Sequence, residues 1–433
     1  MNLERFIAKR VAASNKRSFS GLIIKIAIAA VALSLAIMII TSAVIAGFKN
    51  QISEKIFGFW GHIHITSTYI NRTTGEAVPL DVNQSFYPSL TDIDKIGYYE
   101  NASLFGYELP FEIEKETKGG VRHIQTFCLI PGIIKTKKEI EGIVLKGIAD
   151  DFDWTFFERY LIDGERIAPS DSSSQRGIIL SKQTADRLQL KVGDRFNFNY
   201  IKNKEALQRR FTVHGIYKTG LEEYDRKFAL VNINQLQQLL GWQPDQVSGF
   251  EVFIDDLSDL EVLSDHIYIE EIPGEMYAES IRSKYPAIFE WLALQNINEV
   301  VIIILMLIVG LINMITALLI LILERTNMIG IMKALGQTDW GIRKTFLYHA
   351  GMIIASGLLW GNLLGIGFCV LQKYTGIIQL SEENYYLSTA PVELNIWTIL
   401  LLNAGAMLMI MLFLIIPSWL VTKISPVKAI RFK

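Results

Sequence analysis

The sequence predicts an integral membrane protein with four transmembrane α-helices and a large α+β domain inserted between the first and second helices. Four apolar runs are each long enough to supply the roughly 20 residues, rising about 1.5 Å each, that cross the hydrocarbon core of a bilayer. A polar stretch of about 245 residues separates the first two runs. Charge is also divided: residues 49–294 carry 27 Lys and Arg against 37 Asp and Glu, a net charge of −10, and the rest of the chain carries a net charge of +8.

The apolar runs and their flanks divide the chain into nine segments. The first run could instead be a secretory signal peptide, but it is far longer than the roughly 7–15 residues of a signal core, and no clear cleavage site follows it. We therefore interpret it as a span. The predicted segments are an amphipathic N-terminal segment (1–20), the first span (21–48), the outer domain (49–295), the second span (296–323), a loop (324–346), the third span (347–373), a short loop (374–395), the fourth span (396–421) and a tail (422–433).

The positions of Lys and Arg predict which side of the membrane each segment faces. Cytoplasmic loops are enriched in these residues, and short loops are the most informative because large domains cross largely regardless of charge. Residues 377–394, between the third and fourth spans, contain neither Lys nor Arg. Both termini and the 324–346 loop are therefore expected in the cytoplasm, with the acidic domain outside. The basic residues behind this prediction are Arg5, Lys9, Arg10, Lys16, Arg17, Arg325, Lys333, Arg343, Lys344, Lys423, Lys428, Arg431 and Lys433.

Hydrophobic patterns in the outer domain predict a mixture of strands and helices. The strands fall into groups around residues 61–148 and 176–256, so we expect two subdomains. A helical pattern over residues 275–298 leads into the second span, and the first span continues to Ile56. Both helices would then project beyond the membrane as stiff levers. The expected strands are 61–66, 176–180, 195–201, 209–217 and 250–254, and the expected helices are 181–190, 232–240 and 257–266.

The sequence contains no residue pattern that indicates an enzyme. The signatures of serine hydrolases, zinc proteases, dithiol redox sites and P-loops are absent, so we expect no catalytic residue, metal or cofactor in this chain. His62 and His64 share one face of a predicted strand without a supporting Cys or carboxylate, and we interpret them as exposed strand residues. Cys128 and Cys369 are expected to be separate buried thiols. The acidic middle also excludes a basic nucleic-acid-binding face.

The third span carries a face of small residues. Gly357, Gly361 and Gly365 recur every four residues, so one side of the helix lacks side chains and another helix can approach it closely in lipid. The spacing predicts a helix-packing surface. It fits both a surface that moves during function and one that is static.

The 324–346 loop contains a predicted short helix. Gly336 is a natural helix stop, and Thr338 or Asp339 can cap the following helix. A short amphipathic helix of this kind either lies on the membrane or docks into a groove of a partner, and the pattern leaves both open. The apolar residues at helical spacing are Met328, Ile329, Ile331, Met332 and Leu335.

The same loop resembles the coupling motif of ABC-transporter permeases of the MacB/FtsX-like superfamily, in which a pattern like E-x-G-I-x-x-A-L-G precedes the third span. Asn327 stands here where an acidic residue is common. The four spans, the large domain with a MacB-like periplasmic core and the ending Ile424–Arg431 are also similar to this family. The matching loop residues are Met328, Ile329, Gly330, Ile331, Met332, Lys333, Ala334, Leu335 and Gly336.

Segments of the outer domain narrow the resemblance to the lipoprotein-releasing (Lol) branch of that superfamily. They are residues 144–148, 177–194, 211–225 and 386–394. The carrier-binding hairpin of that branch would correspond to Tyr200–Arg210, which is short here.

The resemblance implies a bacterial inner-membrane permease that pairs with a second permease, the same or a related chain, and with a cytoplasmic ABC ATPase dimer that binds ATP and magnesium. The motif helix would dock into the ATPase, and ATP-driven movement would be passed outward. The substrate would be an acylated lipoprotein taken from membrane lipid and passed to a periplasmic carrier. Candidate cavity-lining residues in the outer halves of the first two spans are Met38, Ile45, Phe48, Ile304, Leu305 and Ile308.

Two other functions fit the same architecture. One is efflux of amphiphilic small molecules or peptides. The other is a signalling permease that transports nothing and controls a cell-wall hydrolase. All three functions need an ATPase, so the coupling motif does not separate them.

Overall fold

The computed structural model describes residues 19–68, 78–104, 107–136, 139–170, 175–202 and 205–424. The chain forms two compact units. The helical unit contains residues 1–50, 290–379 and 389–433, and the outer unit contains residues 51–289 and 380–388. Most of the predicted N-terminal amphipathic segment, and residues 425–431 of the family-like ending, lie outside the described residues.

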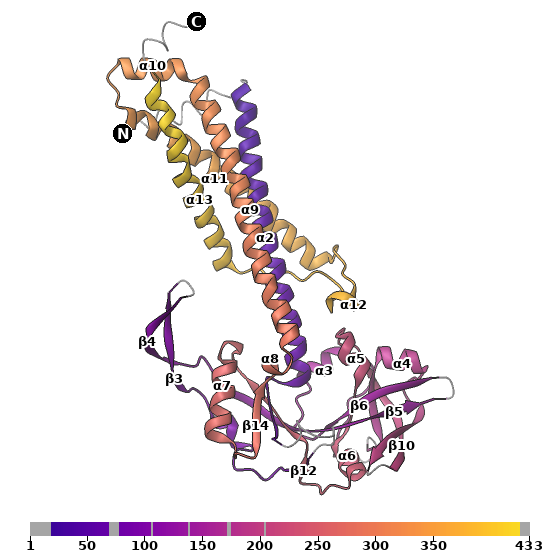
Figure 1. Ribbon diagram of the computed structural model, residues 1–433. Coiled ribbons are helices and arrows are strands. Elements are labelled where there is room, and N and C mark those ends of the chain that lie inside the picture. Colours follow the sequence, from indigo (N-terminus) through magenta and orange to yellow (C-terminus); the bar gives the residue numbers. More distant parts are fainter. Residues whose placement is uncertain are drawn as a thin grey trace. The chain divides into compact units, whose positions relative to one another are not determined.

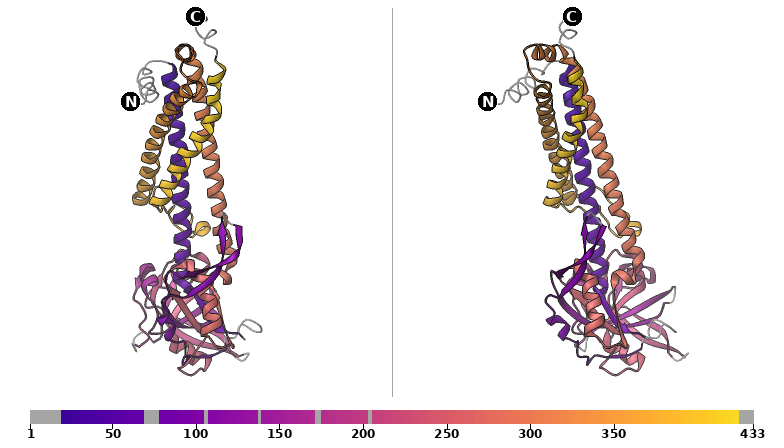
Figure 2. Two further views of the ribbon diagram at one scale, coloured as in Figure 1. Left: turned by 90° about the vertical axis from the view of Figure 1, so that its left-hand side faces the viewer. Right: turned by 60° about the vertical axis from the view of Figure 1, so that its left-hand side comes forward.

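Four long helices build the helical unit, and Figures 1 and 2 show them running alongside one another. All four are long and apolar enough to cross a membrane. Each forms because a run of apolar residues satisfies its backbone hydrogen bonds internally, as a lipid environment requires. The helices are α2 (Phe19–Trp60), α9 (Pro286–Glu324), α11 (Asp339–Thr375) and α13 (Ile396–Ser418), and the last continues into a 3₁₀ turn, η5 (Trp419–Lys423).

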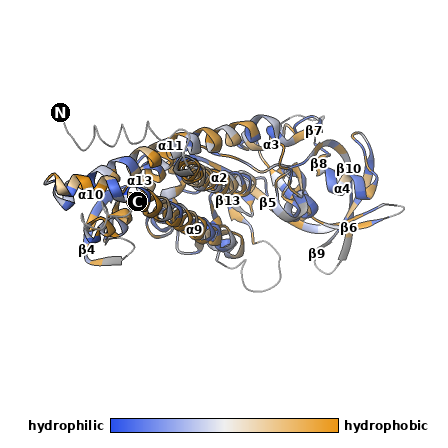
Figure 3. Cartoon of the chain, turned by 90° about the horizontal axis from the view of Figure 1, so that it is seen from above, coloured by the Kyte–Doolittle hydropathy of each residue, from blue (hydrophilic) through white to orange (hydrophobic). Residues whose placement is uncertain are grey.

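Helix α2 is the most enclosed of the four helices. Within this chain, 44% of its most apolar window is buried, against 17% for the corresponding window of α9. Figure 3 shows hydrophobic colouring along α9 and α13. Many of the hydrophobic side chains of α9 are exposed. An exposed apolar helix face in this unit is therefore available to lipid or to another subunit.

One ten-stranded sheet organises the outer unit. Its order is β14-β1-β13-β5-β6-β11-β8-β10-β7, and β9 pairs with both β10 and β5. The pairing of β9 with β5 closes part of the sheet on itself, which removes open edges there. The strands are β1 (Ile63–Ser67), β5 (Val121–Lys135), β6 (Ile140–Ile148), β7 (Leu161–Gly164), β8 (Gly177–Ser181), β9 (Arg195–Lys202), β10 (Glu205–Tyr217), β11 (Phe228–Asn232), β13 (Gly249–Ile254) and β14 (Met276–Ser280).

The two groups of strands expected to form separate subdomains are joined in this sheet. Strand β5 pairs with β13 and β9, and β6 pairs in parallel with β11. These long-range pairings cross between the groups, so strands distant in sequence share one core. Grouping by sequence position does not reveal such pairings.

Short elements cover or extend the sheet. The helices expected at residues 181–190, 232–240 and 257–266 are confirmed with small shifts in their ends. The short helices are α3 (Thr155–Tyr160), α4 (Lys182–Leu188), α5 (Glu222–Lys227), α6 (Ile233–Leu240), α7 (Leu260–His266), α8 (Ile281–Lys284) and α12 (Glu382–Tyr385), with turns η1 (Ser89–Asp92), η3 (Leu257–Asp259) and η4 (Ile267–Glu271). Smaller sheets pair β2 (Leu80–Asp81) with β12 (Gln246–Val247) and β3 (Gly97–Leu104) with β4 (Tyr107–Glu116).

The prediction of a single helix over residues 275–298 is wrong in its first part. Residues 276–280 form β14, which pairs with β1 at the edge of the sheet. Met276, Ala278 and Ser280 are buried, and the residues between them are half-buried. The side chains therefore alternate with the period of a strand, and pairing with β1 outweighs the local helical pattern.

A buried ion pair holds the end of α2 against the sheet. Lys146 on β6 and Glu251 on β13 are both fully buried, and Lys146 Nζ lies 2.7 Å from Glu251 Oε1. The same ammonium donates to the carbonyl oxygen of Phe59 at 2.8 Å, in the last turn of α2. Burial lowers the pKa of Lys146, and the Glu251 carboxylate opposes this effect. The ammonium thus satisfies an orphan carbonyl at the negative end of a helix.

Removing one member of this pair should be costly, because the remaining charge would be buried without a partner. Lys146→Met is expected to lower the free energy of unfolding by about 3–5 kcal/mol, and the double variant Lys146→Met/Glu251→Leu should recover most of that loss. Thermal unfolding of the purified full-length protein in detergent measures both. Equal destabilisation in the single and double variants would show that the unpaired charge is not the cause.

Candidate functional site

The predicted loop helix is α10 (Thr326–Ala334), between the end of α9 and the start of α11. It ends because Gly336 takes a positive φ of 89°, a conformation that favours glycine. The N–H groups of Gly336 and Gln337 donate to the carbonyls of Lys333 and Met332, both at 3.0 Å. Thr338 Oγ1 then accepts from the Gly341 N–H at 3.2 Å and caps α11. The structure confirms the helix, its stop and Thr338 as the cap.

One face of α10 packs into the helical unit. Ile329 and Gly330 are buried, and Met328 and Met332 are half-buried against the same hydrophobic cluster. That cluster includes Ile342 of α11. These motif residues therefore anchor α10 to the bundle.

Lys333 ties α10 to the end of the fourth membrane helix. Its Nζ donates to the carbonyl oxygens of Thr422 at 3.2 Å and Ile424 at 3.0 Å, and it lies 2.8 Å from Asp339 Oδ1. Hydrogen bonds from a charged donor are among the stronger ones in proteins. Lys333 thus positions α10 against the residues that follow α13. Its place in a basic loop of the sequence did not reveal this role.

The opposite face of α10 is apolar and exposed. Leu335 is 82% exposed and Ile331 is 52% exposed. The two are four residues apart, so they lie on the same side of the helix, and Ala334 beside them is also exposed. The nine motif residues therefore divide into an anchoring set and an outward apolar surface, which we call the Ile331–Leu335 surface.

The six candidate cavity residues differ in how far they are exposed within the described part of the chain. Ile304, Leu305 and Ile308 of α9 are exposed, whereas Met38 of α2 is buried. Ile45 and Phe48 are half-buried.

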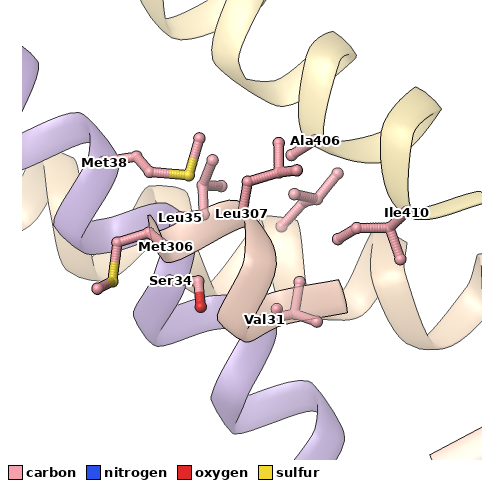
Figure 4. A pocket seen from close by; sticks show the side chains of 10 residues that line it. Val31, Ser34, Leu35, Met38, Met306, Leu307, Ala406 and Ile410 are labelled. Carbon is pink, nitrogen blue, oxygen red and sulfur yellow. The ribbon is translucent and has the colours of Figure 1, made fainter. Parts of the chain in front are cut away.

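Met38 lines a small space between helices. It lies there with Ser34 of α2, Met306 of α9 and Ile410 of α13, as Figure 4 shows. The space measures about 10 Å³, close to the smallest volume that holds one water molecule. It is therefore too small for an acyl chain.

The three glycines of the third span lie directly against α2. A Cβ atom at Gly361 would stand 2.8 Å from the carbonyl oxygen of Ala32, and one at Gly357 would stand 2.7 Å from a methyl group of Val31. At Gly365 the nearest atom, Ala36 Cα, would be 3.1 Å away. The small-residue face of α11 therefore allows close packing on α2.

A polar contact that the sequence reading missed joins α11 to α13. Asn362 and Asn403 exchange side-chain hydrogen bonds of 2.7 and 3.0 Å. Each amide satisfies the other where water is scarce. The sequence does show one Asn inside each of these two apolar runs, but only the structure shows that they pair with each other.

His62 and His64 are buried, so the expectation that they are exposed strand residues is wrong. The Ile254 N–H donates to His62 Nδ1 at 2.8 Å, and burial lowers the pKa of His62 to about 3. His64 Nε2 lies 2.7 Å from the Trp60 carbonyl oxygen and 3.6 Å from Glu251. His64 lies on β1, whose five residues are all buried, and His62 immediately precedes that strand. The described residues contain no group of three metal-ligating side chains.

The segment Leu380–Ser388 packs onto the outer unit beside a cleft of about 420 Å³. Lys218 Nζ lies 2.6 Å from Glu382, and Lys55 Nζ donates to the Tyr386 carbonyl oxygen at 2.8 Å. Of the charged side chains that line the cleft, Lys182 pairs with Asp186, Glu222 accepts a hydrogen bond from Gln183, and Asp225 accepts one from Thr219. These contacts indicate a docked loop and give no evidence for a ligand site.

Comparison with known proteins places both halves of the chain in one kind of permease. The MacB-like periplasmic core domain family matches residues 26–267, and the FtsX-like permease C-terminal family matches residues 300–426. The chain is 23% identical to the lipoprotein-releasing system transmembrane protein LolC of Haemophilus influenzae over 66% of this chain and 69% of LolC. It is 21% identical to LolE of the same organism over 99% of both chains. The crystal structure of the periplasmic region of MacB from Actinobacillus actinomycetemcomitans covers 55% of this chain, with 97% of that chain aligned, 13% identity and a TM-score of 0.33.

Alanine at two glycines of α11 should have opposite effects. Gly361→Ala places a Cβ atom within 2.8 Å of the α2 backbone and is expected to destabilise the protein by about 1–3 kcal/mol. Gly367→Ala meets nothing within 4 Å and should be neutral or stabilising by up to about 1 kcal/mol, because alanine favours the helix. Thermal unfolding of both variants in detergent compares them. Similar melting temperatures would contradict the close α2–α11 packing.

Proposed function

Because the chain belongs to the MacB/FtsX-like superfamily of ABC-transporter permeases, and within it to the LolC/LolE-type branch, we propose that it is a permease subunit of an ATP-driven complex that extracts lipoproteins from the outer leaflet of the inner membrane. It is then a transport subunit and not itself an enzyme. The Ile331–Leu335 surface is the observation that carries the mechanism. It is an apolar surface that no described residue of this chain covers, on a helix fixed to the membrane bundle.

The Ile331–Leu335 surface is the proposed contact with a cytoplasmic ABC ATPase dimer. A short helix with apolar residues on one side suits a hydrophobic groove. The buried Ile329 and the three contacts of Lys333 support this role, because they let a push on α10 act on α11 and on the end of α13. ATP and magnesium would bind the ATPase, and this chain supplies the surface that receives its motion.

The proposed orientation puts α10 and both termini in the cytoplasm and the outer unit in the periplasm. The basic residues near α10 and the lack of Lys and Arg at residues 377–394 support it. It is also the orientation that lets a cytoplasmic ATPase reach α10.

Helices α2 and α9 are the proposed transmission elements. With 42 and 39 residues, they are about 63 and 58 Å long at 1.5 Å per residue. Each is about twice the thickness of a hydrocarbon core. Helix α2 ends at the buried Lys146–Glu251 pair, so movement of α2 would be passed to β6 and β13.

Acylated proteins need an apolar route out of the bilayer. Removing acyl chains from lipid costs about 0.8 kcal/mol per CH₂, or about 35 kcal/mol for three chains of sixteen carbons. We propose that the exposed face of α9, with Ile304, Leu305 and Ile308, supplies part of this route. A second permease subunit, identical or related, would complete it by covering these exposed side chains of α9. A periplasmic carrier would then receive the lipoprotein.

Depletion of this protein tests the function. If it releases lipoproteins, newly made outer-membrane lipoproteins should accumulate in the inner membrane of depleted cells, as sucrose-gradient fractionation would measure. Normal sorting in a strain that lacks any second permease of this type would refute lipoprotein release. Amphiphile efflux that persists in the depleted cells would argue against the efflux alternative. A loss of cell-wall hydrolase activity in those cells would support the signalling alternative.

A charged residue on the Ile331–Leu335 surface should release the ATPase. Leu335→Asp is expected to weaken binding by at least about 2 kcal/mol, roughly 30-fold, because it puts a charge into an apolar contact. Co-purification of the ATPase with the full-length permease measures this effect. Met332 is less suitable for this test, because it is half-buried against the bundle.

The matched control is Ile269→Asp, which adds the same charge at an exposed apolar residue of the outer unit. It should leave the ATPase bound. Undiminished co-purification with Leu335→Asp would contradict the proposed contact.

A further inference from the structure

A group of cations and tryptophans lies where the start of α11 meets the end of α13. We propose that this group binds the phosphate of an anionic phospholipid whose acyl chains lie along the two helices. The cations are Arg343, Lys344 and Lys423, and the rings are those of Trp340 and Trp419. The site is separate from the Ile331–Leu335 surface and does not depend on the proposed transport function.

Two hydrogen bonds hold Arg343 in place and leave other N–H groups of its guanidinium available. Its Nε donates to Ser418 Oγ at 3.1 Å, and its Nη2 donates to the Ile415 carbonyl oxygen at 3.0 Å. These bonds fix the guanidinium of α11 to Ser418 and Ile415 of α13, and Ser418 is the residue before Trp419. Its Nη1 makes no hydrogen bond to any residue that the structure describes. A planar guanidinium with free N–H groups suits a phosphate oxygen.

Two further cations belong to the group, and each lies near an indole ring. Lys423 Nζ is 4.7 Å from the centre of the Trp419 ring, and Lys344 Nζ is 5.8 Å from the centre of the Trp340 ring. The Arg343 guanidinium also lies 5.1 Å from the Trp340 ring. Both indoles are about half exposed. Tryptophan with cationic neighbours is typical of the headgroup region of a bilayer.

No carboxylate neutralises this group among the described residues. The nearest acidic residue in sequence, Asp339, is paired with Lys333 at 2.8 Å. No Asp or Glu occurs at residues 340–381 or 394–433. The three positive charges therefore remain available to an anion, and each contributes about 1 kcal/mol near a charged membrane surface.

The helix faces below the cations favour a lipid over free phosphate. Trp340, Lys344, Tyr348 and Met352 follow one another at four-residue steps on α11, so they share one side of the helix. Tyr348 and Met352 are exposed, as are Leu412 and Ile416 on α13. Each helix thus presents a cation near its end and an exposed apolar surface further along, which matches a phosphate joined to acyl chains.

Lipid binding to the full-length protein in detergent tests the proposal. Native mass spectrometry would titrate phosphatidylglycerol and phosphatidylcholine with identical acyl chains. Phosphatidylglycerol should bind more tightly, and Lys344→Gln/Lys423→Gln should weaken it about 25-fold, at about fivefold per cation. This double variant spares the hydrogen bonds of Arg343, so folding should be kept. Adding Arg343→Gln to this double variant should lower the affinity for phosphatidylglycerol about a hundredfold relative to the unchanged protein.

The matched control is Lys373→Gln, which removes an exposed positive charge at the opposite end of α11 and should leave phosphatidylglycerol binding unchanged. Equal binding of the two lipids, or unchanged binding by the double variant, would overturn the proposal. Displacement of phosphatidylglycerol by millimolar inorganic phosphate would reassign the site to free phosphate. Loss of the ATPase with lipid binding intact would reassign it to a protein contact.

Discussion

A buried ammonium at the end of α2 is the contact on which the link between membrane helix and outer sheet depends. Lys146 reaches from β6 to the Phe59 carbonyl oxygen and to Glu251 on β13. The carbonyls at a helix C-terminus carry partial negative charge, so the ammonium bonds two negative groups at once. One side chain thereby fixes a helix end to two strands. Detaching the helix end would cost the buried ammonium one of its two partners and leave the Phe59 carbonyl oxygen without this hydrogen bond.

The glycine face of α11 determines how the helical unit is assembled. Three positions without side chains bring α11 against α2, and the Asn362–Asn403 pair joins α11 to α13. Helix α2 is consequently enclosed, whereas α9 keeps an exposed apolar face. In lipid, close packing and a few polar contacts do the work that hydrophobic burial does in water. The same chain thus has one closely packed helix and one helix with an exposed apolar face.

The cytoplasmic end proposed for the bundle combines two surfaces of different chemistry. On α10, Ile331 and Leu335 form an apolar surface backed by Ile329 and Lys333. Where α11 meets α13, cations and indoles gather, and no described carboxylate is paired with these cations. An apolar surface suits a protein groove, and a cationic one suits phosphate. The sequence did not reveal this difference, because Trp419 and Lys423 lie far along the chain from α10 and join Arg343 only through the packing of α11 against α13.

The sequence alone determined the four spans, the inserted α+β domain, the loop helix and its stop at Gly336. These features depend on local composition, on periodicity and on the special conformation of glycine, all of which are readable along the chain. Family membership followed from the motif around that helix and was confirmed by the matches to both halves of the chain.

Only the tertiary structure decided which residues of these segments face inward. The role of Lys333, the burial of His64 and the joining of both strand groups in one sheet depend on partners far away in sequence. Residue 276 begins a strand and not a helix because β1 lies beside it. A local pattern does not specify its distant partner, and burial, ion pairing and strand register all depend on that partner.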